Sequence, residues 1–230
     1  MKSLLFFTLM IPCLVFAKEK QTSKGELFDL DGKTKRFSYE RFHDEGAEQQ
    51  TDRSLYKDLQ GDVMVEEKLI TKNGEFVSYA IDHKQTGEKG LVEKRGDKIF
   101  FQKTKSDGKV DTDTESYPSH FMVGMQIVSY MRQHWDALKG GKKVEIRLGV
   151  WSRTETIGFR LRKGDSKAGE FVVVMEPSSF FIRSLVDPLH FYFDPSDKRL
   201  VKITGRTQPK IKKDGKWKDF DALSKYYPVQ

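Results

Sequence analysis

Histidines and carboxylates are the side chains of this chain that could bind a metal, and their spacing does not favour a metal site. The chain has 230 residues and five histidines, which stand far apart: His43, His83, His120, His134 and His190. None forms a pair with the spacing that zinc ligands show. We therefore expect surface or rim histidines, and we expect no metal and no cofactor.

An acidic cluster in SDGKVDTDTE has the alternation of a calcium-binding loop. Its members are Asp107, Asp111, Asp113 and Glu115. The glycine and the closing glutamate are misplaced for an EF-hand, however. A solvated turn followed by an edge strand is the favoured interpretation.

Motifs of nucleophilic, metallohydrolase and nucleotide chemistry are missing from the sequence. There is no Gly-x-Ser-x-Gly elbow, no His-Glu-x-x-His, no phosphate-binding glycine loop and no dinucleotide fingerprint. No catalytic residue can be named, so we do not expect an enzyme.

An unusually apolar stretch, MEPSSFFIRSLVDPLHFYF, runs from Met175 to Phe193, and Pro177 and Pro188 bound the connection within it. Connections between strands are normally polar. Two interpretations are open: the segment plugs the end of a curled sheet as core, or it lines the mouth of a cavity for an apolar ligand. The second makes the ligand-binding rim a set of nine residues: Met125, Val128, Trp135, Trp151, Phe180, Phe181, Arg183, Leu185 and Val186.

A helix of about residues 119–138 is expected to lie across the concave face of a curved sheet. Pro118 precedes it and Gly140-Gly141 follow it, which is typical helix punctuation. Apolar residues recur at steps of three and four and would form one stripe: Phe121, Met125, Val128, Met131, Trp135 and Leu138. The other positions are too polar for a membrane span, and we expect no transmembrane helix in the mature chain.

Turn signals elsewhere predict an antiparallel meander. Dipeptides such as Asp31-Gly32 and Asn73-Gly74 separate segments in which apolar and polar residues alternate. β-type segments resume after the helix. We predict an α+β fold, in which a strongly curved antiparallel sheet, an incomplete barrel, wraps one long amphipathic helix.

The first 17 residues, MKSLLFFTLMIPCLVFA, have the pattern of a secretory signal peptide. A positive Lys2 precedes an apolar run, and Ala17 ends a small-residue cleavage site. We expect cleavage, a single domain over residues 18–230 and a periplasmic location. Cys13 follows Pro12 rather than a small residue, so an ordinary signal cysteine is favoured over a lipid anchor.

The net charge of the chain is +7, with basic and acidic residues interleaved along the sequence. This pattern favours a solvated surface of mixed sign over attraction to anionic headgroups or envelope polymers. Nucleic acid is not an expected partner, because no recognised binding motif occurs.

The run MEPSSFFIRSLVDPLHFYFDPSDKRLVKITGRT resembles the C-terminal signature of uncharacterised exported bacterial proteins. Together with the signal peptide, the meander and the helix, it is similar to the lipoprotein-carrier-like superfamily of the bacterial envelope. That resemblance implies an incomplete barrel with a helical lid over an apolar cavity. The family's locking arginine would be either Arg183 or Arg206.

Two functions follow as expectations. The first is a periplasmic binding or carrier protein for a lipid or for lipoprotein acyl chains. The alternative is a non-catalytic structural or interaction protein of the cell envelope, with an envelope protein as its partner.

Overall fold

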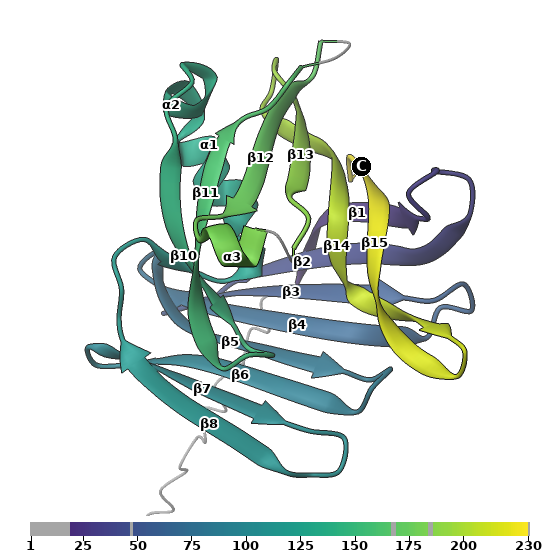
Figure 1. Ribbon diagram of the computed structural model, residues 1–230, viewed down its shortest axis with the longest axis vertical. Coiled ribbons are helices and arrows are strands. Elements are labelled where there is room, and N and C mark those ends of the chain that lie inside the picture. Colours follow the sequence, from purple (N-terminus) through teal and green to yellow (C-terminus); the bar gives the residue numbers. More distant parts are fainter. Residues whose placement is uncertain (1–18, 47, 167–168, 184–185, 230) are drawn as a thin grey trace, which may run out of the picture.

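The computed structural model describes residues 19–46, 48–166, 169–183 and 186–229; the predicted signal peptide lies outside them. The described chain is built mainly of strands, joined in one 15-stranded sheet (Figure 1). The strands are β1 (Lys20–Phe28), β2 (Lys35–Glu45), β3 (Gln50–Lys57), β4 (Val63–Lys72), β5 (Glu75–His83), β6 (Glu88–Arg95), β7 (Lys98–Thr104), β8 (Val110–Ser116), β9 (Phe121–Met122), β10 (Val144–Val150), β11 (Glu155–Lys163), β12 (Phe171–Pro177), β13 (Leu189–Asp194), β14 (Arg199–Lys213) and β15 (Lys216–Tyr227).

The helices of the described chain are short. They are a 3-10 turn, η1 (Gly124–Gln126), and the α-helices α1 (Ile127–Gln133), α2 (Trp135–Lys139) and α3 (Phe180–Arg183). Within the described ranges, no helix has both the length and the apolar character needed to cross a membrane.

The first and last strands, β1 and β15, are neighbours in the middle of the sheet. Its strand order is β8-β7-β6-β5-β4-β3-β2-β1-β15-β14-β13-β12-β11-β10-β9, so the first strand pairs with the last. All neighbours are antiparallel except β9 and β10, which are parallel. In Figure 1, β1–β8 form one layer, and β10–β13 rise steeply away from it beyond β14 and β15.

The predicted hairpins are confirmed. Asn73 and Gly74 connect β4 to β5 with φ values of 52° and 78°. Both residues need the left-handed region, which glycine and asparagine enter at little cost. Asp31-Gly32, Gly96-Asp97 and Asp107-Gly108 likewise lie between paired strands. The prediction of an acidic edge strand is also confirmed, since β8 ends the sheet.

The predicted α+β class with one long helix is wrong. The structure is mainly β, and residues 119–138 contain β9, η1, α1 and most of α2 instead of a continuous helix. Phe121 and Met122 are extended, because they pair in parallel with Arg147 and Leu148 of β10. The helical part is broken at His134, whose φ and ψ are −100° and 20°.

The apolar stripe misled the prediction because its residues serve two different cores. One, the β4–β7 core, contains Phe121, Val123 and Met125 of the segment, together with Val65, Leu69, Phe76, Tyr79, Ile81, Val92, Ile99, Phe101 and Trp151. The other, the β10–β13 core, contains Met122, Ile127, Met131, Trp135 and Leu138, together with Ile146, Ile157, Phe159, Leu161, Phe171, Val173, Met175, Phe191 and Phe193. Segment 121–139 therefore separates two layers and fills the space between them.

Candidate functional site

Four of the predicted rim residues lie in, or pack against, two separate cores: Met125, Val128, Trp135 and Trp151. Met125 and Trp151 are 6% and 8% exposed and belong to the β4–β7 core. Trp135 is 4% exposed and belongs to the β10–β13 core, against which Val128 packs. The structure does not bring these four side chains together around one space.

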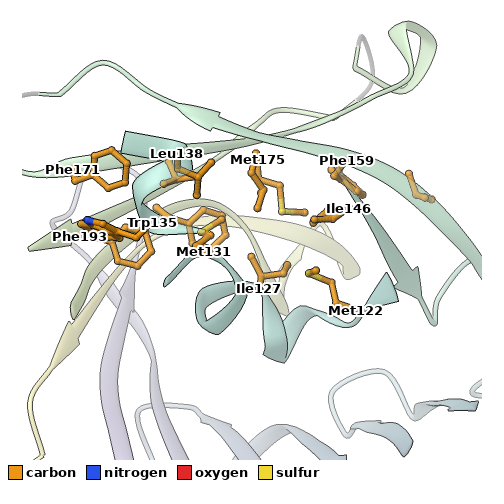
Figure 2. Packing of buried hydrophobic residues seen from close by; sticks show 14 residues of the cluster. Met122, Ile127, Met131, Trp135, Leu138, Ile146, Phe159, Phe171, Met175 and Phe193 are labelled. Atoms are coloured by element: carbon orange, nitrogen blue, oxygen red, sulfur yellow. The ribbon is translucent and has the colours of Figure 1, made fainter. Parts of the chain in front are cut away.

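Packing around Trp135 is dense. Its ring lies 4.6 Å from the Phe171 ring and 5.6 Å from the Phe193 ring, measured between centroids. Met131 and Leu138 flank it and are fully buried. Figure 2 shows Met131, Trp135 and Leu138 of the helices facing the strands that carry Phe171 and Phe193. A helix covering a sheet in this way forms an ordinary core.

The predicted apolar connection contributes both to the core and to the surface. Ile182 packs against the β10–β13 core, and its carbonyl accepts a hydrogen bond of 3.0 Å from the Val186 N–H. Phe180 is 78% exposed. Leu185 and the side chains of Phe181 and Arg183 lie outside the described part of the structure.

Arg206, the second candidate for a locking arginine, has carboxylate partners. Its Nε donates to Asp221 Oδ1 at 2.8 Å, and it also contacts Asp219. All three lie on β14 and β15. This arginine ties two strands together, as the cross-strand pairs of a sheet commonly do.

Two hollows of the described surface lie away from the predicted site. One, of about 760 Å³, is lined by Gln21, Lys24, Gly25, Glu26, Lys35, Ser38, Tyr39, Glu40, Tyr227 and Pro228. The other, of about 360 Å³, is lined by Lys72, Asn73, Glu75, Phe76, Val77 and Lys94. Neither includes a residue of segment 121–139 or of α3.

A buried polar row is the main feature of the interior that the sequence analysis missed. Arg41, Ser54 and Glu67 lie opposite one another on β2, β3 and β4. Ser54 and Glu67 are 1% and 3% exposed. Such groups must have hydrogen-bond partners to be tolerated in a core.

Glu67 is the centre of this row. Its Oε1 accepts hydrogen bonds from Tyr79 Oη at 2.6 Å and from Gln208 Nε2 at 3.1 Å. Burial raises the pKa of the Glu67 carboxyl, and these hydrogen bonds and the nearby Arg41 charge oppose that rise only in part. Burial also raises the pKa of Tyr79 well above its ordinary value. Burial thus shifts both groups towards their neutral forms.

Arg41 links the polar row to the segment above it. Its Nη1 donates to the Met125 carbonyl at 3.1 Å, and its Nη2 lies 3.3 Å from Asp52 Oδ2. His43 Nδ1 lies 3.2 Å from Asp52 Oδ1. The row thus fixes η1 on the sheet, and every polar group named in it has a partner.

A period-two pattern could have revealed Glu67. Val63, Val65, Glu67 and Leu69 alternate along β4, and Val65, Glu67 and Leu69 are all buried. A glutamate on the apolar face of a strand needs partners from other elements. Gln208 lies 141 positions away, so its identity as a partner was not accessible from the sequence.

The structure brings no metal ligands together among the residues it describes. No group of three or more histidine, cysteine, aspartate or glutamate side chains there could hold an ion. His83 Nε2 donates to the Gln208 carbonyl at 3.0 Å and joins β5 to β14. Asp111 of the acidic cluster pairs with Lys105 at 2.8 Å.

Comparison with known proteins finds no relative of this chain. Neither a protein-family model, nor a curated protein, nor a solved structure matches it.

Proposed function

We propose that this chain is an exported, non-catalytic interaction protein of the bacterial cell envelope, which acts through its surface rather than by holding a lipid inside. One observation carries the proposal: segment 121–139 buries its side chains in both layers of the fold. The signal-peptide pattern of residues 1–17 supports export.

Packing argues against the carrier interpretation. An acyl carrier needs a continuous apolar channel, and such sites are usually formed before the ligand arrives. The corresponding space here holds Met131 and Leu138, both fully buried, and Trp135. A lipid would have to displace close-packed side chains, which is costly.

The chemistry of the interior supports a structural role. Glu67, whose carboxyl pKa is raised by burial, accepts hydrogen bonds at its Oε1 from Tyr79 and Gln208. A general acid or base needs a substrate within hydrogen-bond reach. Neither described hollow is lined by Glu67.

Native mass spectrometry of protein purified from the envelope tests the absence of an internal ligand. We expect the mass of the chain alone, and organic extraction should recover no stoichiometric lipid. Met131→Ala is the matched positive control, because it opens a buried apolar cavity of the kind that binds small apolar molecules. A stoichiometric lipid on the wild-type protein would contradict the proposal.

Photocrosslinking in intact cells tests the positive part. A photoreactive residue at exposed Leu59 should give a discrete adduct, whereas the same residue at buried Phe101 should give none. If crosslinkers at Leu59, Phe180 and Trp217 all give no adduct, a surface role is wrong.

A further inference from the structure

The outer end of the β14–β15 hairpin, residues 210–218, projects beyond the neighbouring strand; we call it the basic tip. β1 pairs with β15 only from Leu223 to Tyr227, so the earlier residues of β15 extend past it. Figure 1 shows this yellow hairpin reaching across the lower layer. Asp214 and Gly215 form its turn with φ values of 51° and 74°.

Hydrogen bonds hold the basic tip in place. The Gln85 side chain donates to the Lys210 carbonyl at 2.9 Å and accepts from the Lys210 N–H at 2.8 Å. His83 and Gln208 are linked one step closer to the core. These contacts fix the base of the hairpin against β5 and the turn after it.

Positive charge is concentrated on the basic tip. Its sequence, KIKKDGKWK, has one acidic residue, Asp214, against five lysines: Lys210, Lys212, Lys213, Lys216 and Lys218. Lys210 pairs with Asp219 at 2.9 Å. Lys212, Lys216 and Lys218 are exposed, and within the described ranges no carboxylate lies within 4.0 Å of them. Their charges are therefore available to a partner.

An exposed tryptophan accompanies the lysines. Trp217 is 40% exposed, whereas Trp135 and Trp151 are buried. Lys212 lies opposite Trp217 in the hairpin, with its Nζ 5.7 Å from the indole ring.

We propose that the basic tip docks the protein on an anionic lipid bilayer. Lysines attract anionic headgroups, and an exposed indole is favoured at headgroup depth, where its ring is apolar and its N–H stays hydrated. The proposal rests on the proposed function in that the protein acts through its surface, and it names the partner of that surface.

Sedimentation of the purified mature chain with vesicles tests the proposal. Binding should be stronger to vesicles of phosphatidylglycerol and phosphatidylethanolamine than to phosphatidylcholine vesicles, and it should weaken with salt. Replacing Lys212, Lys216 and Lys218 by Gln should lower the partition coefficient roughly 100-fold, at roughly fivefold per lysine. Trp217→Ala should also weaken binding, and Trp217→Phe should abolish the fluorescence blue shift on binding.

A charge-matched variant separates docking by the basic tip from general attraction. Lys139, Lys142 and Lys143 are exposed around the α2–β10 connection, which Figure 1 shows far from the basic tip. Their triple replacement by Gln removes the same charge and should leave most of the binding. Thermal melting of both triple variants controls for unfolding, and substitutions at exposed positions such as these change stability little.

Three outcomes would overturn the proposal: no preference of the wild-type protein for anionic vesicles, equal losses in the two triple variants, or binding to soluble polyglutamate with none to vesicles. The last would identify an anionic polymer as the partner. The native mass spectrum of the purified protein does not depend on any of these vesicle-binding results. Failure of the docking proposal is therefore distinguishable from failure of the proposed function.

Discussion

The carboxylate of Glu115 accepts two hydrogen bonds from Thr156, one from its hydroxyl at 2.6 Å and one from its N–H at 3.1 Å. Glu115 lies on β8, at one end of the sheet order, and Thr156 lies on β11, near the other end. Arg147 Nη2 donates to the same hydroxyl at 2.7 Å. This contact joins the two ends of the strand order without backbone pairing between them.

Glu115→Gln should lower the free energy of unfolding by about 1–3 kcal/mol. The amide offers one acceptor oxygen in place of two, so one donor of the buried Thr156 loses its partner. Urea denaturation measures the change. Asp113→Asn, at an exposed position of the same strand, is the control and should change stability by less than about 0.5 kcal/mol. Equal effects in both variants would refute the link.

Gly90→Ala should destabilise the protein by about 1–3 kcal/mol, because Trp151 occupies the space of the missing side chain. An added Cβ would lie 2.6 Å from Trp151 Cε3 and 2.8 Å from Ile81 Cγ2. Thermal melting checks the stability, and the near-UV circular dichroism of the indole checks its displacement. Gly124→Ala, where nothing lies within 4 Å of the new Cβ, should cause no loss.

Met131→Ala should lower the free energy of unfolding by about 2–5 kcal/mol, the range for large-to-small changes in close-packed cores. Met131 is fully buried in the β10–β13 core. Gln133→Ala, on the exposed side of the same helix, is the control. A loss below about 0.5 kcal/mol for Met131→Ala would mean that the interior is loosely filled, and the carrier interpretation would regain support.

Glu67→Gln should change how stability depends on pH. Burial raises the pKa of Glu67 in the folded protein above its ordinary value of 4.5. The unfolded chain therefore loses this proton first, and the stability contributed by the group falls as pH rises from 4.5 towards the folded pKa. Relative to wild type, the variant should gain stability across that interval, as measured by urea denaturation at successive pH values.

Tyr79→Phe is the companion of that variant. The Tyr79 hydroxyl donates to Glu67 and lowers the pKa of its carboxyl. Removing the hydroxyl should extend the decline in stability to higher pH. If wild type and Glu67→Gln show the same pH dependence, the carboxyl does not titrate as its burial requires.

Local signals in the sequence predicted the hairpins. They could not predict how the apolar residues are divided between the two cores. Asn73-Gly74 defines its turn through backbone conformations that few other residues adopt. Phe121 and Met125 recur at helical spacing, yet Phe121 is extended, because it pairs with Arg147 of a later strand. Tertiary pairing overrode the period of the apolar residues.

The basic tip was also not predicted from the sequence. Overall, basic and acidic residues alternate, and the average hides the run KIKKDGKWK. Only the hairpin register places Lys212 beside Trp217 and leaves both exposed. The polar row likewise depends on Gln208, which reaches Glu67 from β14.

Pairing of the first strand with the last has a consequence for how the chain matures. Tyr227 donates to Glu26 across 201 positions, within the β1–β15 pair. While the chain is being synthesised, one edge of β1 stays without its partner until the final strand emerges. Contacts of such long sequence separation form slowly, because the intervening loop must first be closed. The β1–β15 pair is therefore expected to be among the last parts of the sheet to form.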